Sequence, residues 1–363
     1  MGMCMLSKSI AERPIRVLII EDSAFYRQAL TKMLSSVHRI EIIGTAIDGA
    51  DAIMQVTKQR PDVITLDLEM PRVDGFVFLR WLMKNVPTPV VVVSSQSDQA
   101  NVFKALELGA VDFLAKPAPH STSKIMEMRD ELIAKIITVS CIPIERLNPR
   151  ILSYEEGLSL PVLALRRQGR KFKEIELVVI GASTGGPTAV QSIVVQLPKG
   201  FPLPVAVTQH MPPGFTQYFA ERLNKLSHIP VCEARPGDLL EKGRVYICPG
   251  GYHMVFQRSR QEVRIQLNEK RDSDRYVPSV DQMFSSACEI YPGRVLGIIL
   301  TGMGNDGKIG MRKIKEGGGQ TIAESEQTAV VYGMPKEVIE DGVVDKVLPL
   351  SHIAREIIRS ISS

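Results

Sequence analysis

The stretch "VVIGASTGGPTA" at residues 178–189 passes from an aliphatic run into a glycine-rich turn and then into a helix-forming segment. It predicts a buried strand, a sharp turn and a helix with Pro187 near its first position. The turn "GASTG" formally satisfies G-x-S-x-G, the nucleophile elbow. Glycines followed by a helix N-terminus equally suit a bound phosphate. The turn by itself therefore leaves three interpretations open: a nucleophile at Ser183, a phosphate or nucleotide loop, and a structural turn.

Two later strand-like runs bear on this choice. "LPVAVTQH" ends at His210, and only this one of the six histidines directly follows a run of strong strand character. "RVLGIILTGMGNDG" ends in a glycine-rich turn that carries Asp306. If the strands are parallel neighbours, Ser183, His210 and Asp306 meet at one edge of the sheet. Since a serine nucleophile needs a base and the base needs an orienting carboxylate, the set favours a Ser-His-Asp triad.

Each member of this set also has a structural alternative. Ser183 and Asp306 could cap helices, and His210 could be a hydrogen-bonded histidine at a strand end. The chain order Ser, His, Asp differs from the order Ser, Asp/Glu, His of α/β-hydrolases, so that fold is not expected. A dinucleotide loop would require an acidic residue about 20 residues further on, where residues 202–207 are apolar.

The first third of the chain alternates strand-like and helix-like segments about every 12 to 15 residues, which indicates βαβ units and a parallel sheet. Polar side chains follow the strand-like runs, namely Glu21, Asp22, Asp67, Ser94 and Lys116. Each alone is typical of a solvated strand end. Together they have a chemical meaning, because two acids can hold a hard cation such as Mg²⁺. The cation and Lys116 can then neutralise a phosphoryl group on Asp67, while Ser94 hydrogen-bonds one of its oxygens.

The segments "VLIIEDS", "DVITLDLEMPRVDG", "VVVSS" and "AVDFLAKP" closely resemble the receiver domain of bacterial response regulators, over about residues 15–137. The resemblance implies that a histidine kinase phosphorylates Asp67. It implies that Mg²⁺ is held by Glu21, Asp22 and Asp67. It also implies a set of switch residues that respond to the phosphoryl group, Ser94, Phe113 and Lys116.

The segments "GASTGGP", "TQHMPPGFT", "AERLNKLS", "PSVDQMF", "ILTGMGNDG" and "YGMPKEV" resemble the catalytic domain of the protein-glutamate methylesterases, the CheB-type chemotaxis response regulators, over about residues 175–361. The resemblance implies hydrolysis of glutamate methyl esters on chemotaxis receptors with release of methanol, and deamidation of receptor glutamines. It assigns Ser183 as nucleophile, His210 as general base and acid, and Asp306 as orienting carboxylate. No metal or cofactor is expected for the ester hydrolysis.

Further positions match this family outside the triad. The backbone at Met303 is the expected oxyanion contact, Thr184 and Arg275 are expected at the oxyanion or substrate site, and His253 matches without a clear role. The chain departs from the family at Val277, where a second basic residue is frequent. The departure concerns contacts of the substrate near that position and does not affect the triad.

These patterns predict an α/β chain with a doubly wound receiver at 14–137, a linker at 138–173 and a three-layer, parallel-sheet catalytic domain at 174–363. The linker can be a solvated connection, or its "LSLPVLAL" can dock on a partner or between the domains. The net charge of +4 does not imply nucleic-acid binding. The five cysteines are scattered, without C-x-x-C spacing, which favours a reducing cytoplasm.

Apolar runs are shorter than the roughly 18 residues of a membrane span, and residues 1–13 do not form a signal peptide pattern. The sequence thus predicts a monomeric cytoplasmic protein that is not inserted in the membrane. Its expected partners are a chemotaxis histidine kinase and the methyl-accepting receptors.

Overall fold

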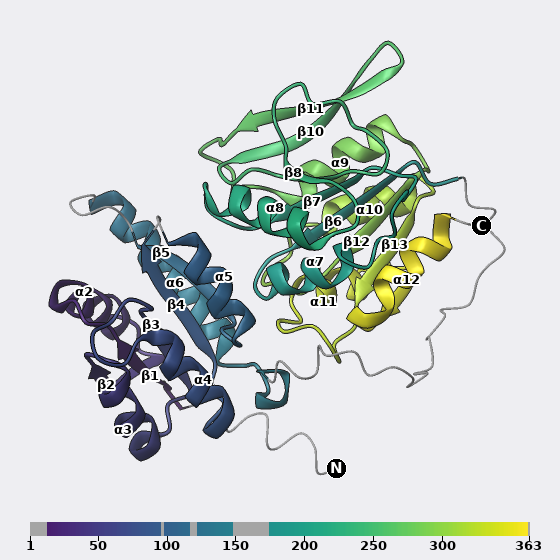
Figure 1. The fold of residues 1–363 in the computed structure, drawn as a ribbon. Coiled ribbons are helices and arrows are strands. Elements are labelled where there is room, and N and C mark those ends of the chain that lie inside the picture. Colours follow the sequence, from purple (N-terminus) through teal and green to yellow (C-terminus); the bar gives the residue numbers. More distant parts are fainter. Residues whose placement is uncertain (1–12, 96–97, 117–121, 148–173, 362–363) are drawn as a thin grey trace. The chain divides into compact units, whose positions relative to one another are not determined.

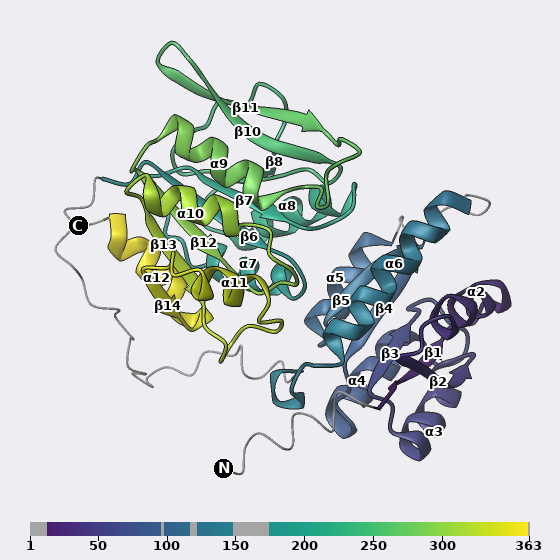
Figure 2. The same ribbon diagram turned by 180° about the vertical axis from the view of Figure 1, so that it is seen from behind.

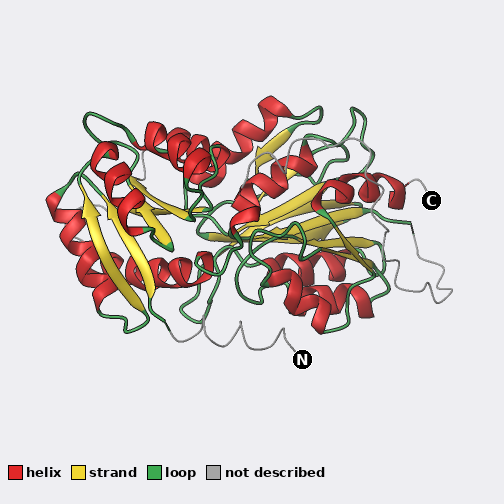
Figure 3. Cartoon of the chain, turned by 90° about the horizontal axis from the view of Figure 1, so that it is seen from below, coloured by secondary structure: helices red, strands yellow, loops and turns green. Residues whose placement is uncertain are grey.

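The computed structural model describes residues 13–95, 98–116, 122–147 and 174–361, which fall into two compact units that divide near residue 151 (Figure 1). Each unit is built around its own parallel β-sheet. Figure 3 shows the strands of each sheet lying between layers of helices. This architecture confirms the predicted α/β class.

The N-terminal unit contains a five-stranded sheet of order β2-β1-β3-β4-β5, in which all pairs are parallel. Its strands are β1 (Ile15–Ile20), β2 (Ile40–Ala46), β3 (Val63–Leu66), β4 (Val90–Ser95) and β5 (Asp112–Lys116). Its helices are α2 (Ala24–Ser35), α3 (Gly49–Gln59), α4 (Gly75–Asn85), α5 (Gln99–Glu107) and α6 (Thr122–Val139). Figure 2 shows helices on both faces of this sheet, with α2 packed against α6 and α3 against α4. Both faces of the sheet are therefore covered, which explains the nearly unbroken aliphatic runs in the sequence.

The strand order of this unit reverses between β1 and β3. In a doubly wound sheet such a reversal opens a crevice beyond the carboxyl ends of the strands. Glu21 and Asp22 directly follow β1, and Asp67 directly follows β3. The topology alone therefore brings the three acids to one point.

The chain continues to pack on the N-terminal unit after α6. A short 3₁₀ helix, η1 (Ile144–Leu147), follows, and Leu147 is buried with its carbonyl against Gly109. The remainder of the expected linker, including "LSLPVLAL" at 158–165, lies outside the described residues.

The C-terminal unit contains a seven-stranded parallel sheet of order β14-β13-β12-β6-β7-β9-β8. Its strands are β6 (Leu177–Ala182), β7 (Val205–Gln209), β8 (Val231–Glu233), β9 (Val245–Ile247), β12 (Val295–Ile299), β13 (Gln320–Glu324) and β14 (Lys346–Leu348). Helices α7 (Gly186–Val194), α8 (Phe215–Leu226) and α12 (Leu350–Ile361) pack on one another, as do α9 (Val280–Ile290), α10 (Lys308–Glu316) and α11 (Met334–Glu340). The two helix groups and the sheet form the three predicted layers.

An antiparallel ribbon of β10 (Tyr252–Ser259) and β11 (Glu262–Glu269) lies over α9. The hydroxyl of Ser286 in α9 accepts from the Phe256 amide and donates to the Phe256 carbonyl, which ties the ribbon to the helix. The chain then returns through residues 270–279 to the start of α9. This ribbon was not among the elements expected from the sequence.

The order of the large sheet also reverses beside β6. From β6 the chain proceeds outward to β7, and the neighbour on the other side of β6 is β12. Ser183 follows β6, His210 follows β7, and Asp306 lies in the turn after β12. The crevice at this reversal is therefore where the three predicted triad residues must meet.

Candidate active site

The turn after β6 presents Ser183. The Ser183 amide donates to the Thr301 carbonyl at 3.0 Å, and the Ser183 carbonyl accepts from the Gly186 amide at 2.7 Å. Gly185 between them has φ +76°, a left-handed conformation that strongly favours glycine. A Cβ at Gly185 would also lie 2.8 Å from the Cβ of Val330. The glycines of "GASTGG" are therefore needed for a sharp turn that leads directly into α7.

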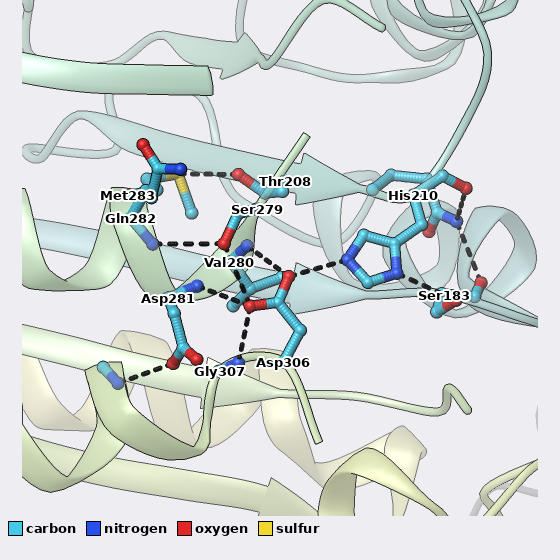
Figure 4. Close-up of polar contacts among 12 residues, drawn as sticks. Ser183, Thr208, His210, Ser279, Val280, Asp281, Gln282, Met283, Asp306 and Gly307 are labelled. Carbon is cyan, nitrogen blue, oxygen red and sulfur yellow. Dashed lines mark hydrogen bonds and ion pairs between the residues drawn. The ribbon is translucent and has the colours of Figure 1, made fainter. Parts of the chain in front are cut away.

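Ser183, His210 and Asp306 form a continuous hydrogen-bonded chain (Figure 4). His210 Nδ1 lies 3.2 Å from Ser183 Oγ, and His210 Nε2 lies 2.8 Å from Asp306 Oδ2. Because a carboxylate can only accept, the proton of the neutral imidazole is on Nε2. Nδ1 then directs its lone pair at the serine hydroxyl, which is the arrangement of a general base.

Asp306 is buried, and its carboxylate is surrounded by donors from the start of α9. It accepts from the Val280 amide at 2.7 Å, the Asp281 amide at 2.9 Å and the Ser279 hydroxyl at 3.1 Å (Figure 4). Burial alone would raise the pKa of Asp306, but the bonds from His210 and from these amides outweigh it and hold the pKa below its usual value. The carboxylate therefore stays charged beside the imidazole.

The N-terminus of α9 reaches Asp306 because the helix packs tightly on the sheet. A Cβ at Gly181 would lie 2.3 Å from Val280 Cγ1, so only glycine in β6 admits this approach. Ser279 caps the helix and accepts from the Gln282 amide at 3.4 Å. The helix dipole adds positive potential at the carboxylate. The pattern Ser279-x-x-Gln282 is a capping-box signature that could have indicated this helix start from the sequence.

Tyr276 is a site residue that sequence reasoning missed. Its ring stacks on the His210 imidazole with centroids 5.0 Å apart and planes 10° apart. The Arg275 guanidinium lies 5.2 Å from the centroid of the same tyrosine ring. A Cβ at Gly304 would lie 2.3 Å from Tyr276 Oη, so the tyrosine also contacts the turn after β12. Arg275 thus contacts Tyr276, and Tyr276 in turn contacts His210.

His253 holds the segment that carries these two side chains. Its Nε2 lies 2.9 Å from Asp274 Oδ2, and its Nδ1 accepts from the Ser279 amide at 3.1 Å. The imidazole is buried between its two partners. Since both ends of the segment 274–279 bind to one ring, Arg275 and Tyr276 are presented from a fixed loop.

Thr184 and Met303 belong to the two chain segments beside Ser183. Thr184 directly follows Ser183, and Met303 directly follows Gly302, which packs against it. A Cβ at Gly302 would lie 2.7 Å from Ser183 Cβ, which places the start of the Gly302–Gly304 turn directly against Ser183. Thr184 is buried, and its carbonyl accepts from the Thr301 hydroxyl at 2.9 Å. Both residues are close to the triad, and their part in substrate binding remains a proposal.

The N-terminal unit brings together the acidic residues expected around Asp67. Ligand oxygens of Glu21, Asp22 and Asp67 lie within 4.8 Å of one another. Lys116 Nζ lies 2.6 Å from Asp67 Oδ2 and 2.8 Å from Glu21 Oε2. Three carboxylates at this spacing are a hard-oxygen donor set that fits a divalent cation such as Mg²⁺.

The pKa values at this acidic site are shifted because several charged groups are buried close together. Burial and the nearby Asp67 raise the pKa of Glu21 to about 7, despite the opposing effect of Lys116. Burial on its own would lower the pKa of Lys116, but the carboxylates of Asp67 and Glu21 reverse this and raise it. The site thus carries excess negative charge that a cation would relieve.

The two other predicted switch residues are buried at the neighbouring strands. Ser94 at the end of β4 donates to Asp98 Oδ2 at 2.9 Å, and Phe113 in β5 lies beside Val92 of β4. The hydroxyl of Ser94 is therefore engaged with Asp98 in the unphosphorylated chain. Residues 117–121, with Pro117, lie outside the described part.

The comparisons with known proteins agree with both units. Residues 178–357 match the family model of the CheB methylesterase, and residues 17–128 match that of the response regulator receiver domain. A protein-glutamate methylesterase/protein-glutamine glutaminase of Geobacter sulfurreducens is 48% identical over 361 residues, covering 96% of this chain and 97% of the relative. The chain belongs to the CheB methylesterase family.

The family spans bacteria and archaea at similar length. A relative of the same description from Pyrococcus abyssi is 40% identical over 96% of this chain and 94% of its own. The crystal structure of the Thermotoga maritima CheB methylesterase catalytic domain is 44% identical, with a TM-score of 0.50, and covers 52% of this chain and 99% of that one. Among the described residues of this family member, no helix is both long and apolar enough to cross a membrane.

Proposed function

We propose that this chain hydrolyses the methyl esters of glutamate side chains, and deamidates glutamines, on chemotaxis receptors. The single observation that carries the proposal is the chain of contacts from Ser183 Oγ through the His210 imidazole to Asp306, at 3.2 and 2.8 Å. The names of the full-length relatives, protein-glutamate methylesterase/protein-glutamine glutaminase, support the same chemistry.

The geometry supports a two-step acyl transfer. Ser183 Oγ attacks the γ-carbonyl carbon as its proton passes to His210 Nδ1, and Asp306 stabilises the imidazolium that forms. The oxyanion of the tetrahedral intermediate is placed at the backbone around Met303. Collapse of the intermediate breaks the bond to the leaving group, and Nδ1–H protonates it, so methanol leaves an ester and ammonia leaves an amide.

A water molecule completes the cycle. His210 Nδ1 takes a proton from the water as its oxygen attacks the acyl-enzyme, and the second intermediate expels Ser183 Oγ, which regains the proton. The products are the free enzyme and the glutamic acid, which releases its remaining proton to solvent to give the carboxylate. Both steps use the same base and the same carboxylate for their proton transfers.

Control of this activity is assigned to the N-terminal receiver. In the proposal a histidine kinase phosphorylates Asp67, with Glu21, Asp22 and Asp67 as the residues that would hold Mg²⁺. When bound, the cation supplies charge neutralisation for the phosphoryl group. Lys116, already 2.6 Å from Asp67, is placed to pair with the phosphoryl oxygens. Ser94 would exchange Asp98 for one of them.

The wider assignments from the sequence are also proposals. A receiver at 14–137 and a catalytic domain from 174 are supported by the division of the chain into two units near residue 151. In the proposal, the partners of this family member are a chemotaxis histidine kinase and the methyl-accepting receptors. A cytoplasmic location and a monomeric state stay predictions from the sequence.

Methanol release from methylated receptor membranes tests the proposal. The wild-type chain should release methanol, and Ser183→Ala should lose on the order of 10⁴ to 10⁶ in kcat. Ser192→Ala is the matched control, because Ser192 in α7 donates only to the Ala189 carbonyl one turn earlier. A wild-type chain that binds receptors and releases no methanol would identify a phosphorylation-switched binding module instead.

A further inference from the structure

Gln209, the last residue of β7, links the two residues between which the proton moves. Its side chain is buried, and its Nε2 donates to the Ser183 carbonyl at 2.9 Å and to the His210 carbonyl at 3.1 Å. These bonds run from one amide nitrogen to the backbone of the nucleophile and to the backbone of the base. The contact joins β6 and β7 beyond the last pair of their ladder, Ala182 with Gln209.

The orientation of this amide is fixed by its surroundings. An amide nitrogen has two hydrogens, and the two carbonyls accept both of them. The reverse orientation would put Gln209 Oε1 against two carbonyl oxygens and leave no donor. In the observed orientation Oε1 is buried, has no hydrogen-bond partner among the described residues, and would lie 2.0 Å from a Cβ at Gly186. Gly186 at the start of α7 is thus the residue that makes room for the amide.

The two bonds complete the fixation of both catalytic residues. Ser183 is also held by its amide bond to Thr301 and by the bond that its carbonyl accepts from Gly186, and the His210 amide donates to the Ala182 carbonyl at 3.1 Å. The His210 bond already joins the histidine backbone to the Ala182–Ser183 peptide group, and the Gln209 amide adds a second link, to the Ser183 carbonyl. The Gln209 amide thus adds a bond between the two backbones whose side chains, Ser183 Oγ and His210 Nδ1, lie 3.2 Å apart.

We infer that Gln209 is a positioning residue of the acyl-transfer reaction, acting through the backbones of Ser183 and His210. The inference rests on the proposed roles of these two residues. A displacement of about 1 Å at reacting groups can cost roughly 10²-fold in rate. Loss of both donated bonds should therefore appear in kcat, with little change in the binding of the substrate.

Two nearly isosteric variants separate the donated bonds from the shape of the side chain. Gln209→Met keeps the length and removes both donors. Gln209→Glu keeps the shape and sets a carboxylate against the two carbonyls, whereas its protonated form retains one O–H donor. Gln196→Met is the matched control, because Gln196 also donates its amide to a backbone carbonyl, that of Ser192.

The experiment uses the full chain with a small-molecule phosphodonor and methylated receptor membranes. In Gln209→Met, kcat for methanol release should fall about 10²-fold, while KM stays within about threefold of wild type. The kcat of Gln196→Met should stay within about twofold of wild type. The ratio of kcat in Gln209→Glu to that in wild type should rise as the pH is lowered from about 8 to about 5, since protonation restores one donor.

A second readout follows the serine without any receptor. A fluorophosphonate reacts when Ser183 Oγ attacks phosphorus, fluoride leaves and the serine proton passes to His210. This rate should fall in Gln209→Met in parallel with kcat. A wild type that reacts with the reagent and releases no methanol would refute the proposed substrate, while the comparison of the Gln209 variants would still test the inference.

The inference is overturned by a Gln209→Met variant with kcat and phosphonylation within about threefold of wild type. It is also overturned if the loss is confined to KM. If Gln209→Met does not fold, Gln209→Glu provides the test. A ratio of its kcat to that of wild type that does not change between about pH 8 and about pH 5 would contradict the role of the donated bonds.

Discussion

Asp281 and Asp306 cap each other's helices. Asp306, in the turn before α10, accepts from the Asp281 amide at 2.9 Å in the first turn of α9. Asp281 in return accepts from the Gly310 amide at 2.7 Å in the first turn of α10. The carboxylate that is hydrogen-bonded to His210 is therefore held in a mutual contact between two helix N-termini. Its direction depends on the register of α9 against α10.

This relationship predicts unequal effects for the two acids. Asp306→Asn should lower kcat/KM for methanol release by roughly 10⁴, because the amide favours the wrong imidazole tautomer. Asp281→Asn should cost about tenfold or less, since the new amide oxygen can still accept from Gly310 and the backbone donor to Asp306 is unchanged. Steady-state kinetics on the two variants decide the ranking. A larger loss in Asp281→Asn than in Asp306→Asn would show that Asp306 is not the orienting carboxylate.

The same pair predicts a pH dependence of stability. Burial, only partly offset by backbone hydrogen bonds, raises the pKa of Asp281 from 3.8 to about 6. Between these values the folded chain binds a proton that the unfolded chain has lost, so stability decreases as the pH rises through this window. Asp281→Asn has no such titration. The Tm of the variant minus that of wild type should therefore increase from about pH 4 to about pH 7.

The catalytic fragment 174–363 suits this measurement, since the corresponding domain of the Thermotoga maritima relative was crystallised alone. A single domain also gives one unfolding transition to compare. A Tm difference that is constant with pH, or that falls as the pH rises, would show that Asp281 does not titrate in this window.

The sequence predicted that Ser183, His210 and Asp306 meet, and did not predict the residues that hold them in place. Ser183, His210 and Asp306 each follow a strongly aliphatic run, and parallel strands that end at one edge bring such residues together. Gln209 carries no such signal, because its partners are two backbone carbonyls. Tyr276 lies in a loop whose path depends on contacts made by His253.

The receiver was predicted more fully than the catalytic unit for a related reason. In this doubly wound five-stranded sheet, the predicted charged residues lie at the strand ends or directly after them: Glu21 and Asp67 follow β1 and β3, and Lys116 is the last residue of β5. The β10–β11 ribbon was missed although Met254, Phe256 and Met254's cross-strand partner Leu267 lie on the face toward α9 with period two. That alternation is typical of a half-buried ribbon and could have been found.

Tyr276 provides a prediction about the imidazole. Aromatic stacking contributes about 0.5–1.5 kcal/mol beyond burial, so Tyr276→Ala should lower kcat/KM by roughly threefold to tenfold. Tyr276→Phe keeps the ring on His210 and should stay within about twofold of wild type. Tyr252→Ala, which removes an exposed tyrosine of the ribbon, is the control. An equal loss of kcat/KM in Tyr276→Ala and Tyr276→Phe would show that the hydroxyl of Tyr276 matters and its ring does not.

The last prediction concerns the receiver. Phosphorylation adds about −1.5 to −2 charges and three acceptor oxygens at Asp67, where Lys116 already lies 2.6 Å away. A small-molecule phosphodonor with Mg²⁺ should increase methanol release by the wild-type chain. Asp67→Ala should be insensitive to the donor, and its Ser183 should react with a fluorophosphonate at the wild-type basal rate. Removal of Mg²⁺ with a chelator should abolish the stimulation without changing the basal rate, because the acids that fit the cation lie in the receiver.

Two comparisons make this prediction decisive. Asp130→Ala removes an exposed acid of α6 and should respond to the donor as wild type does. Lys116→Met should weaken the response, since the phosphoryl group loses the charged side chain that lies nearest to Asp67 among the described residues. Stimulation that persists in Asp67→Ala would place the phosphoryl group on another residue. Stimulation that persists without divalent cations would remove the metal role from Glu21 and Asp22.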